Sequence, residues 1–236
     1  MKSMTRWLKG NSITVAMLVL TLGIVMGWQN QAGATTTTLG PSDDSYVDSA
    51  SADTNFNSSN PNYQYLRAGS TKSSYLKFDL SSIPDGSTIE SAVLNIYTNT
   101  KYPSTATLSV LLSLVSNDSW SESTLTYNDR PDLSGTVTPV SPKTFGTVNT
   151  WVTWDFGSSW SQFNADLADN YLSLKLSSTS TNSYVNFLSS EFVTYFTTTP
   201  SLTITYTAAP VPVPGALLLL GTGLVRLVGY SRRQRI

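Results

Sequence analysis

The segment Ser73–Tyr97 reads SSYLKFDLSSIPDGSTIESAVLNIY, and its spacing of apolar residues decides the fold class. Apolar residues stand at every second position on both sides of a turn, namely at Leu76, Phe78, Leu80, Ala92, Leu94 and Ile96. This period of two is typical of β-strands with one buried face. Pro84-Asp85-Gly86 predicts the turn between them, because proline presets the bend and glycine accepts a positive φ. The intervening residues Tyr75 and Lys77 are expected to face outward.

The same alternation continues over most of Leu39–Thr207. Further inward positions are Leu108, Val110, Leu112, Leu114, Val152, Trp154, Phe156, Leu172, Leu174, Leu176, Val185, Phe187, Leu202, Ile204 and Tyr206. We assign Trp154 to the core. Only Trp160–Asp169 has the spacing of a short helix, with Trp160, Phe163 and Leu167 on one face. Many short strands with little helix predict an all-β fold, a single β-sandwich or jelly-roll domain.

Composition excludes several kinds of chemistry. The chain has 236 residues and neither histidine nor cysteine. A Ser-His-Asp triad, a cysteine nucleophile and the usual zinc sites are therefore excluded. Residues Thr35–Ala209 carry 15 acidic and 7 basic side chains, a net charge of −8. Such a surface repels phosphates, so we expect no nucleic-acid partner.

The N-terminal residues 1–34 predict a secretory signal peptide. A basic stretch precedes the apolar run Ile13–Trp28, and Ala32-Gly33-Ala34 follows it. These are the three parts of a signal peptide, with cleavage by signal peptidase expected after Ala34. The alternative is an uncleaved membrane anchor.

The C-terminal residues 210–236 read PVPVPGALLLLGTGLVRLVGYSRRQRI. A proline-rich stretch, an apolar run and a basic end follow one another, and the apolar part is just long enough for a membrane-spanning hydrophobic helix. This order, with Pro212, Pro214, Arg232 and Arg233, resembles the PEP-CTERM class of sorting signals. The resemblance implies a transient membrane hold and removal by an exosortase-type protease in a Gram-negative bacterium. The alternative is a permanent single-span anchor.

Residues 35–209 carry a second resemblance. The segments PSDDSYVDSASADTNFNSS, SSYLKFDLSSIPDGSTIESAVLNIY and WSESTLTYNDRP occur in this order. They resemble the DNRLRE domain, a disaggregatase-related module classed with carbohydrate-binding modules. The resemblance implies an exported β-sandwich that binds extracellular polysaccharide, with alginate-like glycans as one ligand class. It places the protein outside the cell or on its surface.

Six residues are candidates for carbohydrate binding: Tyr65, Arg67, Tyr75, Lys77, Trp120 and Arg130. Flat aromatic faces suit sugar rings, and an acidic glycan needs cations. Arg67 and Lys77 would lie on neighbouring strands if Tyr63–Ala68 pairs with Tyr75–Leu80. Further aromatic candidates are Tyr97, Tyr127, Trp151 and Tyr184. The alternatives are that the aromatic residues fill the core and that Arg130 pairs with Glu122 or Asp129 to hold a loop.

No cofactor and no catalytic residue is expected. Four carboxylates, Asp43, Asp44, Asp48 and Asp53, lie close in sequence but lack the EF-hand spacing, so a structural calcium ion is only an alternative to solvated loop acids. A glycosidase needs two carboxylates across a cleft, and Glu122 is the strongest single candidate. Three hypotheses therefore stand: a non-catalytic polysaccharide-binding or matrix protein, a structural or adhesive surface protein without a defined glycan, and a carbohydrate-active enzyme.

Overall fold

The computed structural model of the protein describes residues 33–57, 64–156, 163–164, 167–192 and 198–209. These residues belong to one structural unit, Gly33–Ala209. The predicted signal peptide, apart from its last two residues, lies outside the described residues, and so does the predicted sorting segment 210–236. Within the described part of the chain, no helix is long and apolar enough to cross a membrane.

Strands dominate the described residues, and the predicted all-β fold is confirmed. They are β1 (Ala34–Leu39), β2 (Asp43–Asp48), β3 (Phe56–Asn57), β4 (Tyr65–Gly69), β5 (Lys72–Asp79), β6 (Thr88–Tyr102), β7 (Leu108–Val115), β8 (Val137–Phe145), β9 (Thr150–Asp155), β10 (Tyr171–Ser178), β11 (Tyr184–Leu188) and β12 (Ser201–Thr207). Two short 3-10 turns, Ser49–Ser51 and Pro131–Leu133, lie in connections. The strands on both sides of Pro84-Asp85-Gly86 are β5 and β6, as the sequence predicts, and Gly86 has a φ of 74°.

The predicted helix over Trp160–Asp169 is only partly within the described residues. Phe163 is fully buried in the core, and Leu167 packs against the same core. Leu167 donates its backbone N–H to the Phe163 carbonyl at 3.1 Å, which is the hydrogen bond of one helical turn. This contact agrees with the predicted apolar face, and residues 160–162 and 165–166 of the segment lie outside the described ones.

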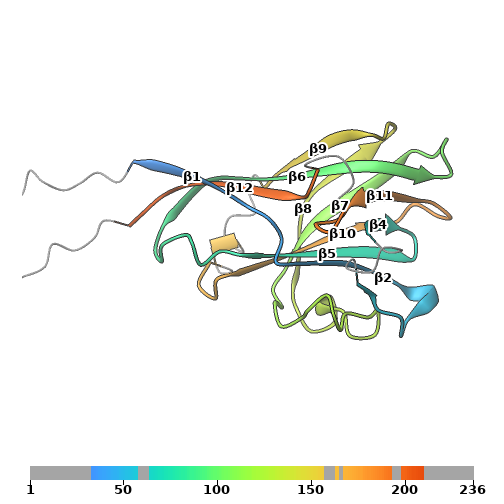
Figure 1. Cartoon of the computed structure of the whole chain (residues 1–236), viewed down its shortest axis with the longest axis horizontal. Coiled ribbons are helices and arrows are strands. Elements are labelled where there is room, and N and C mark those ends of the chain that lie inside the picture. The colour runs from blue at the N-terminus through green and yellow to red at the C-terminus, as the bar shows by residue number, and fades with distance from the viewer. Residues whose placement is uncertain (1–32, 58–63, 157–162, 165–166, 193–197, 210–236) are drawn as a thin grey trace, which may run out of the picture. The chain divides into compact units, whose positions relative to one another are not determined.

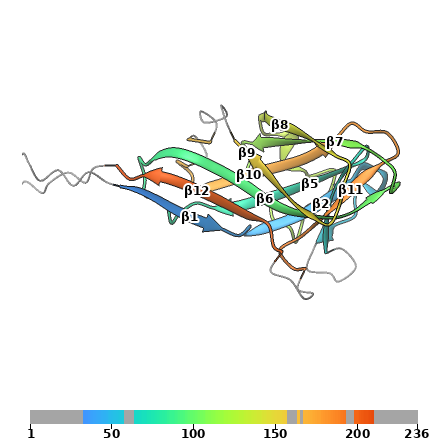
Figure 2. The ribbon, with the colours of Figure 1, turned by 90° about the horizontal axis from the view of Figure 1, so that it is seen from above.

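The strands form two antiparallel sheets that face one another, so the predicted β-sandwich is confirmed. Sheet A has the order β1-β12-β6-β11-β4, with β9 also paired to β6, and sheet B has the order β3-β2-β5-β10-β7-β8. Figure 1 shows β6 and β12 in one layer and β5 and β2 in the other. Ala34 pairs with Thr207, which brings the two ends of the unit side by side (Figure 2). The first and last strands of the unit are therefore neighbours, with β1 at the edge of sheet A.

The core lies between the sheets and is built by the alternating apolar residues. Its fully buried members include Leu76, Phe78, Leu94, Ile96, Leu112, Trp154, Leu174, Phe187 and Ile204. Burial of one such side chain contributes about 1.5–3 kcal/mol. Trp154, assigned to the core from the sequence, is completely buried and donates its indole N–H to the Ser141 carbonyl at 3.2 Å. The period-two pattern thus identified the inner face of β5, β7, β9, β10, β11 and β12, and of β6 over Ala92–Ile96, correctly.

A second, smaller apolar cluster lies on the other face of sheet B. It consists of Val47, Tyr75, Val115, Trp120 and Leu125, with Tyr127 packed against it. The long connection between β7 and β8 supplies Trp120, Leu125 and Tyr127, and it covers β5. Tyr75 is 0% exposed and Lys77 is 9% exposed. The expectation that both face outward into solvent was therefore wrong, because a loop buries the second face of this strand.

The pairing of Tyr63–Ala68 with Tyr75–Leu80, on which the closeness of Arg67 and Lys77 depended, does not occur. β4 pairs with β11 in sheet A, whereas β5 pairs with β2 and β10 in sheet B. The chain passes from one sheet to the other at Ser70 and Thr71. Near this corner the Ser74 hydroxyl bonds both backbone groups of Arg67, accepting from N–H at 2.6 Å and donating to the carbonyl at 2.9 Å. Arg67 and Lys77 consequently belong to different sheets.

Candidate functional site

The six residues predicted to bind carbohydrate lie in two separate parts of the domain. Tyr65 and Arg67 stand on β4 in sheet A, whereas Tyr75, Lys77, Trp120 and Arg130 belong to or surround the small apolar cluster on sheet B. The structure therefore does not bring the six together. Tyr65 is half-buried and packs against Phe192, with 5.5 Å between the ring centroids.

Lys77 and Trp120 hold the β7–β8 connection to sheet B. The Lys77 ammonium forms an ion pair with Asp43 at 3.0 Å and donates a hydrogen bond to the Trp120 carbonyl. It also lies 5.0 Å from the centre of the Trp120 ring. The Trp120 indole N–H donates to the Ser173 hydroxyl at 2.8 Å, and the residue is only 8% exposed. Both side chains are satisfied within the protein, and the indole offers no free face to a sugar.

Tyr75 and Arg130 belong to a network around Asp132. The Tyr75 hydroxyl donates to Asp132 at 2.7 Å, and the Arg130 guanidinium pairs with Asp132 at 3.2 Å. Lys175 pairs with the other oxygen of Asp132. Burial favours the neutral form of Asp132, but hydrogen bonds from Lys175 and Tyr75 outweigh it and lower the pKa of Asp132. Burial, and next the bond to Asp132, raise the pKa of Tyr75.

The structure thus supports the loop-holding alternative for Arg130, with a different partner. The expected partners were Glu122 and Asp129, but the ion pair is made with Asp132. The guanidinium also lies 3.9 Å from the centre of the Tyr127 ring and donates to the Tyr127 carbonyl at 2.6 Å. These contacts fix the turn that carries Asp132, a part of the β7–β8 connection, against β5 and β10 of sheet B.

A β-bulge in β6 reverses which residues face outward near the end of the strand. Asn186 of β11 pairs with Thr100, but the next residue, Phe187, pairs with Thr98, so Asn99 is the extra residue. Before the bulge, even-numbered residues of β6 such as Ile96 and Thr98 face the core. After it, Lys101 is the register partner of buried Val185, and Tyr102 is the partner of Tyr184. A bulge of this kind re-aims side chains, and here it turns Tyr102 to the outer face of sheet A.

Tyr102 and Tyr184 form an aromatic pair at this outer face. Their ring centroids are 5.6 Å apart and their planes differ by 22°. Tyr102 is 61% exposed, and among the described residues it is one of few large aromatic side chains with so much free surface. The pair borders a hollow of about 280 Å³ that is also lined by Ser70, Thr71, Lys72, Asn182 and Ser183. Flat rings beside hydroxyl and amide groups are what a sugar ring requires.

Two cations stand beside the same pair. The Arg67 guanidinium lies 5.8 Å from the centre of the Tyr184 ring, and the Lys72 ammonium lies 5.5 Å from it. Lys72 is neutralised by Asp48 at 2.6 Å. Arg67 donates to the Tyr46 hydroxyl at 3.0 Å and lies 4.8 Å from that ring, and no ion pair joins it to any carboxylate of the described residues. We call Arg67, Lys72, Tyr102 and Tyr184 the aromatic–cation site.

Two buried polar atoms near this site have no hydrogen-bond partner. They are Nε of Arg67 and the side-chain oxygen of Asn186. The two residues are register partners on β4 and β11, so the unused donor and the unused acceptor stand on the same face. The next pair on the same face is Gly69 with Tyr184, and a Cβ on Gly69 would lie 2.6 Å from the Tyr184 Cβ. Glycine is thus required there for Tyr184 to keep its position.

Sequence reasoning selected Arg67 and Tyr184 but missed Tyr102. A strict period of two places Tyr102 on the inner face with Leu94 and Ile96, and the bulge at Asn99 leaves no clear mark in the sequence. Lys72 was not selected as a site residue, because its closeness to Arg67 depends on the corner between the two sheets.

A comparison with known families fits this geometry. The model of carbohydrate-binding module family 96 matches residues 35–206. The chain belongs to that family. No curated protein matches the chain. The predicted carbohydrate-binding-module character of the domain is therefore confirmed, whereas the DNRLRE and PEP-CTERM resemblances stay predictions.

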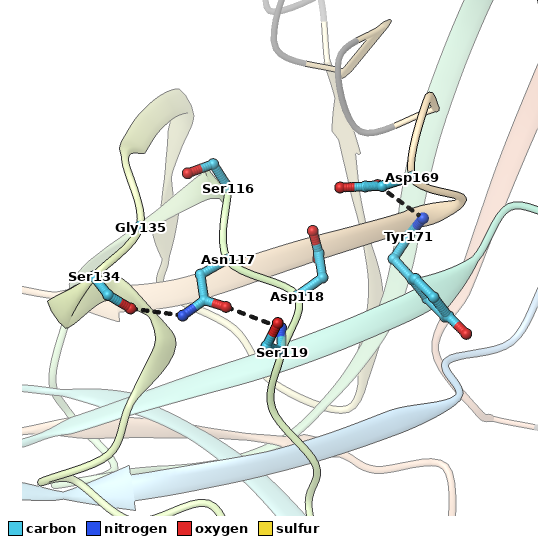
Figure 3. A pocket seen from close by; sticks show the side chains of 8 residues that line it. All are labelled: Ser116, Asn117, Asp118, Ser119, Ser134, Gly135, Asp169 and Tyr171. Atoms are coloured by element: carbon cyan, nitrogen blue, oxygen red, sulfur yellow. Dashed lines mark hydrogen bonds between the residues drawn. The ribbon is translucent and has the colours of Figure 1, made fainter.

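A second hollow of this family 96 domain is acidic. It measures about 460 Å³ and is lined by Ser116, Asn117, Asp118, Ser119, Ser134, Gly135, Asp169 and Tyr171. Figure 3 shows Asp118 between Asn117 and the segment that carries Asp169 and Tyr171. Burial, together with the charge of Asp169, raises the pKa of Asp118. Two carboxylates at one hollow disfavour an acidic sugar, so this hollow is a poorer candidate for such a ligand than the aromatic–cation site.

The carboxylates predicted as a calcium alternative do not cluster. Asp43 pairs with Lys77, Asp48 pairs with Lys72, and Asp53 accepts from the Asn128 amide at 2.6 Å. Asp44 instead approaches Glu122 and Glu191, and one oxygen of each lies within 4.8 Å of the others. Among the described residues this triad is the group that could hold a cation, and carboxylate oxygens are the ligands that calcium prefers.

Glu122 is tied to the backbone of β2. Its carboxylate accepts from the Asp44 N–H at 3.1 Å, and its own N–H donates to Asp43 at 3.2 Å. Burial, and then the charges of Glu191 and Asp43, raise the pKa of Glu122. Asp44 is fully buried. Because Asp44 is inaccessible, Asp44 and Glu122 cannot act on the two sides of a glycosidic bond.

Proposed function

We propose that this family 96 protein is an exported, non-catalytic protein that binds an acidic polysaccharide through the aromatic–cation site. The observation that carries the proposal is the exposed Tyr102 ring beside Tyr184, with Arg67 next to it and without a carboxylate partner among the described residues. Tyr102 stacks on a sugar ring, and Arg67 binds a sugar carboxylate. Family membership supports a carbohydrate ligand, and the charges at the site support an acidic one.

The charge at the aromatic–cation site decides between an acidic and a neutral glycan more than the net charge of the domain does. Residues Thr35–Ala209 have a net charge of −8. Exposed charges farther apart than about 8–10 Å are largely screened at physiological salt. A charge-assisted hydrogen bond contributes about 1.5–3 kcal/mol. Lys72 and Asp48 neutralise each other, so the charge of Arg67 makes the site locally positive. The bond between Arg67 and a sugar carboxylate outweighs the screened repulsion by the distant acidic side chains.

Export and surface location rest on the two ends of the chain. Residues 1–34 have the parts of a signal peptide, and residues 210–236 have the parts of a sorting segment. We propose that signal peptidase removes the first and that an exosortase-type protease recognises the second, in a Gram-negative bacterium. Intact-mass measurement of the exported protein tests this: the mature chain begins at Thr35 and lacks Arg232–Ile236. Recovery of the complete C-terminus contradicts removal by a sorting protease.

Affinity electrophoresis tests the binding proposal. The protein is run through gels that contain alginate or a neutral glucan, and we expect retardation by alginate only. The recovered alginate is then assayed for new reducing ends and unsaturated uronates, and we expect none. Retardation in neither gel would favour a structural or adhesive role without a glycan ligand. New chain ends would favour an enzyme.

A further inference from the structure

The outer face of sheet A carries a second aromatic pair. Tyr97 of β6 and Trp151 of β9 are register partners. Their ring centroids are 5.6 Å apart and their planes are nearly perpendicular, at 81°. Trp151 is 46% exposed and lies on the opposite face of the edge strand β9 from the buried Trp154. A large exposed indole on an edge strand favours a binding role.

We propose that one glycan chain runs along the outer face of β6 and contacts both aromatic pairs, Tyr102–Tyr184 at one end and Tyr97–Trp151 at the other. This inference rests on the proposed function, because it extends the ligand of the aromatic–cation site. It assigns Tyr97 and Trp151 as a second binding subsite for the same acidic polysaccharide.

The bulge at Asn99 puts the two pairs on one face. Tyr97 faces outward, because its neighbours Ile96 and Thr98 are buried. Without an extra residue, Tyr102 would face the core and the two pairs would lie on opposite faces. With the bulge, Thr100 and Tyr102 turn outward, as the hydrogen bond from the Asn186 amide to the Thr100 hydroxyl at 2.7 Å shows. The irregularity in β6 thereby creates a continuous outer surface.

The spacing of the pairs suits a short run of sugars. Tyr97 and Tyr102 are five positions apart on β6. At a rise of about 3.3 Å per residue, this spacing is about 16 Å, which is roughly the length of three linked pyranose rings. The two partner residues stand on opposite sides of β6. Thr98 pairs with Thr150 of β9 and with Phe187 of β11, so these strands occupy different edges. A bound chain would therefore cross β6 obliquely from Trp151 towards Tyr184.

The surface between the pairs is uncharged and rich in hydrogen-bonding groups. Thr100 and Asn186 lie there, joined by the hydrogen bond from the Asn186 amide to the Thr100 hydroxyl. Amide and hydroxyl groups of this kind form hydrogen bonds with sugar hydroxyls. On the far side of Tyr97, the Asn95 side-chain oxygen accepts from the Thr153 hydroxyl at 2.9 Å. The path thus offers ring contacts at its two ends, neutral polar groups between them, and Arg67 at one end only.

Titration with alginate oligosaccharides of increasing length tests this inference on the purified chain. Wild-type affinity should rise from the dimer to about the pentamer and then level off, since only longer chains reach both pairs. Trp151→Thr removes the ring but keeps a residue that favours strands. It should weaken hexamer binding about three- to tenfold, as expected for one lost ring contact, and leave dimer binding unchanged. Trp151→Phe should restore most of the loss.

The controls separate the inference from the function on which it rests. Tyr171→Thr removes an exposed ring at the acidic hollow and should change neither affinity. The extended path is overturned if Trp151→Thr binds the hexamer as tightly as the wild type does, or if wild-type affinity does not depend on oligosaccharide length. Either result leaves the proposed function intact. Absence of binding by the wild type at every length overturns both. Equal loss for dimer and hexamer in Trp151→Thr also contradicts the path, because the dimer should bind at the aromatic–cation site alone.

Discussion

Tyr102 on β6 and Tyr184 on β11 are register partners whose rings lie 5.6 Å apart and nearly parallel. This relationship exists because Asn99 is an extra residue in β6, which turns Tyr102 out of the core direction. A sheet irregularity and a glycine beside Tyr184 thus create a flat aromatic surface at the corner where the chain passes between the sheets.

Removal of the outer ring should weaken binding without weakening the fold. Tyr102→Thr takes away an exposed side chain, so the free energy of unfolding should change by less than about 0.5 kcal/mol. Affinity for alginate should fall about three- to tenfold. Chemical denaturation and titration of the same sample measure both. Unchanged affinity in this variant would exclude Tyr102 from the site.

Replacement of Lys77 should have the opposite effect. Lys77→Met leaves Asp43 without its ion-pair partner and the Trp120 carbonyl without its donor. Breaking a largely buried pair costs about 3 kcal/mol, so the denaturation midpoint should fall clearly. Alginate affinity at a temperature where the variant is folded should be unchanged. Weaker binding by folded Lys77→Met would show that the original selection of Lys77 as a ligand-binding residue was right.

The Glu122 carboxyl should make stability fall as pH rises. Its pKa is raised above the ordinary 4.5, so the folded state holds its proton more tightly than the unfolded state does. Stability from this group is therefore complete below about pH 4.5 and is lost as pH rises through the folded-state pKa. Glu122→Gln should be more stable than wild type at pH 7 and no more stable at pH 4. Glu90→Gln, at an exposed carboxylate, is the control, and a parallel pH profile for Glu122→Gln and wild type would contradict the assignment.

The Asp132 network should act in the opposite pH range. Because the pKa of Asp132 is lowered, its contribution is present above the ordinary 3.8 and is lost as pH falls through the folded-state value. Asp132→Asn should lower the free energy of unfolding at pH 7 by about 3 kcal/mol. On acidification, the free energy of unfolding of this variant should fall less than that of the wild type. Urea denaturation at pH 7 and below pH 3.8 measures the difference. Equal losses on acidification in both proteins would contradict a stabilising role for the Asp132 charge.

The described unit should fold without the two ends. A chain from Thr35 to Ala209 keeps almost all of β1 and the whole of β12, and it should unfold in one cooperative transition. Reducing agent should leave the midpoint unchanged, because the chain has no cysteine. A shorter chain that ends before Ser201 lacks the strand between β1 and β6 and should not fold. A cooperative transition in the shorter chain would contradict this role of β12.

The sequence predicted the strands and the inner core because burial of alternate residues is a local signal. Leu76, Phe78 and Leu94 show it directly, and all are buried as expected. The outer faces were harder to predict. Tyr75 and Lys77 read as solvent-facing because period two cannot show that a loop distant in sequence covers the second face of β5.

The pairing of β4 and the bulge in β6 explain the other differences between the prediction and the structure. Whether β4 pairs with β5 or with β11 depends on the corner at Ser70 and Thr71, which turns the chain into the other sheet. The bulge at Asn99 changes the facing of Tyr102 without changing the apolar pattern before it. Arg67 was selected for its charge and its expected place beside Lys77, but because of that corner its neighbour at the site is Lys72.

Titration of alginate into wild-type protein and Arg67→Gln at two salt concentrations, about 0.05 M and about 0.5 M, tests the central claim most directly. Wild-type affinity should fall at the higher salt, since a screened ion pair contributes to binding. Arg67→Gln should bind about tenfold or more weakly at low salt, and its affinity should depend less on salt, at a temperature where denaturation shows the variant to be folded. Equal affinity of the two proteins at both salt concentrations would contradict an acidic-glycan site at Arg67, Tyr102 and Tyr184.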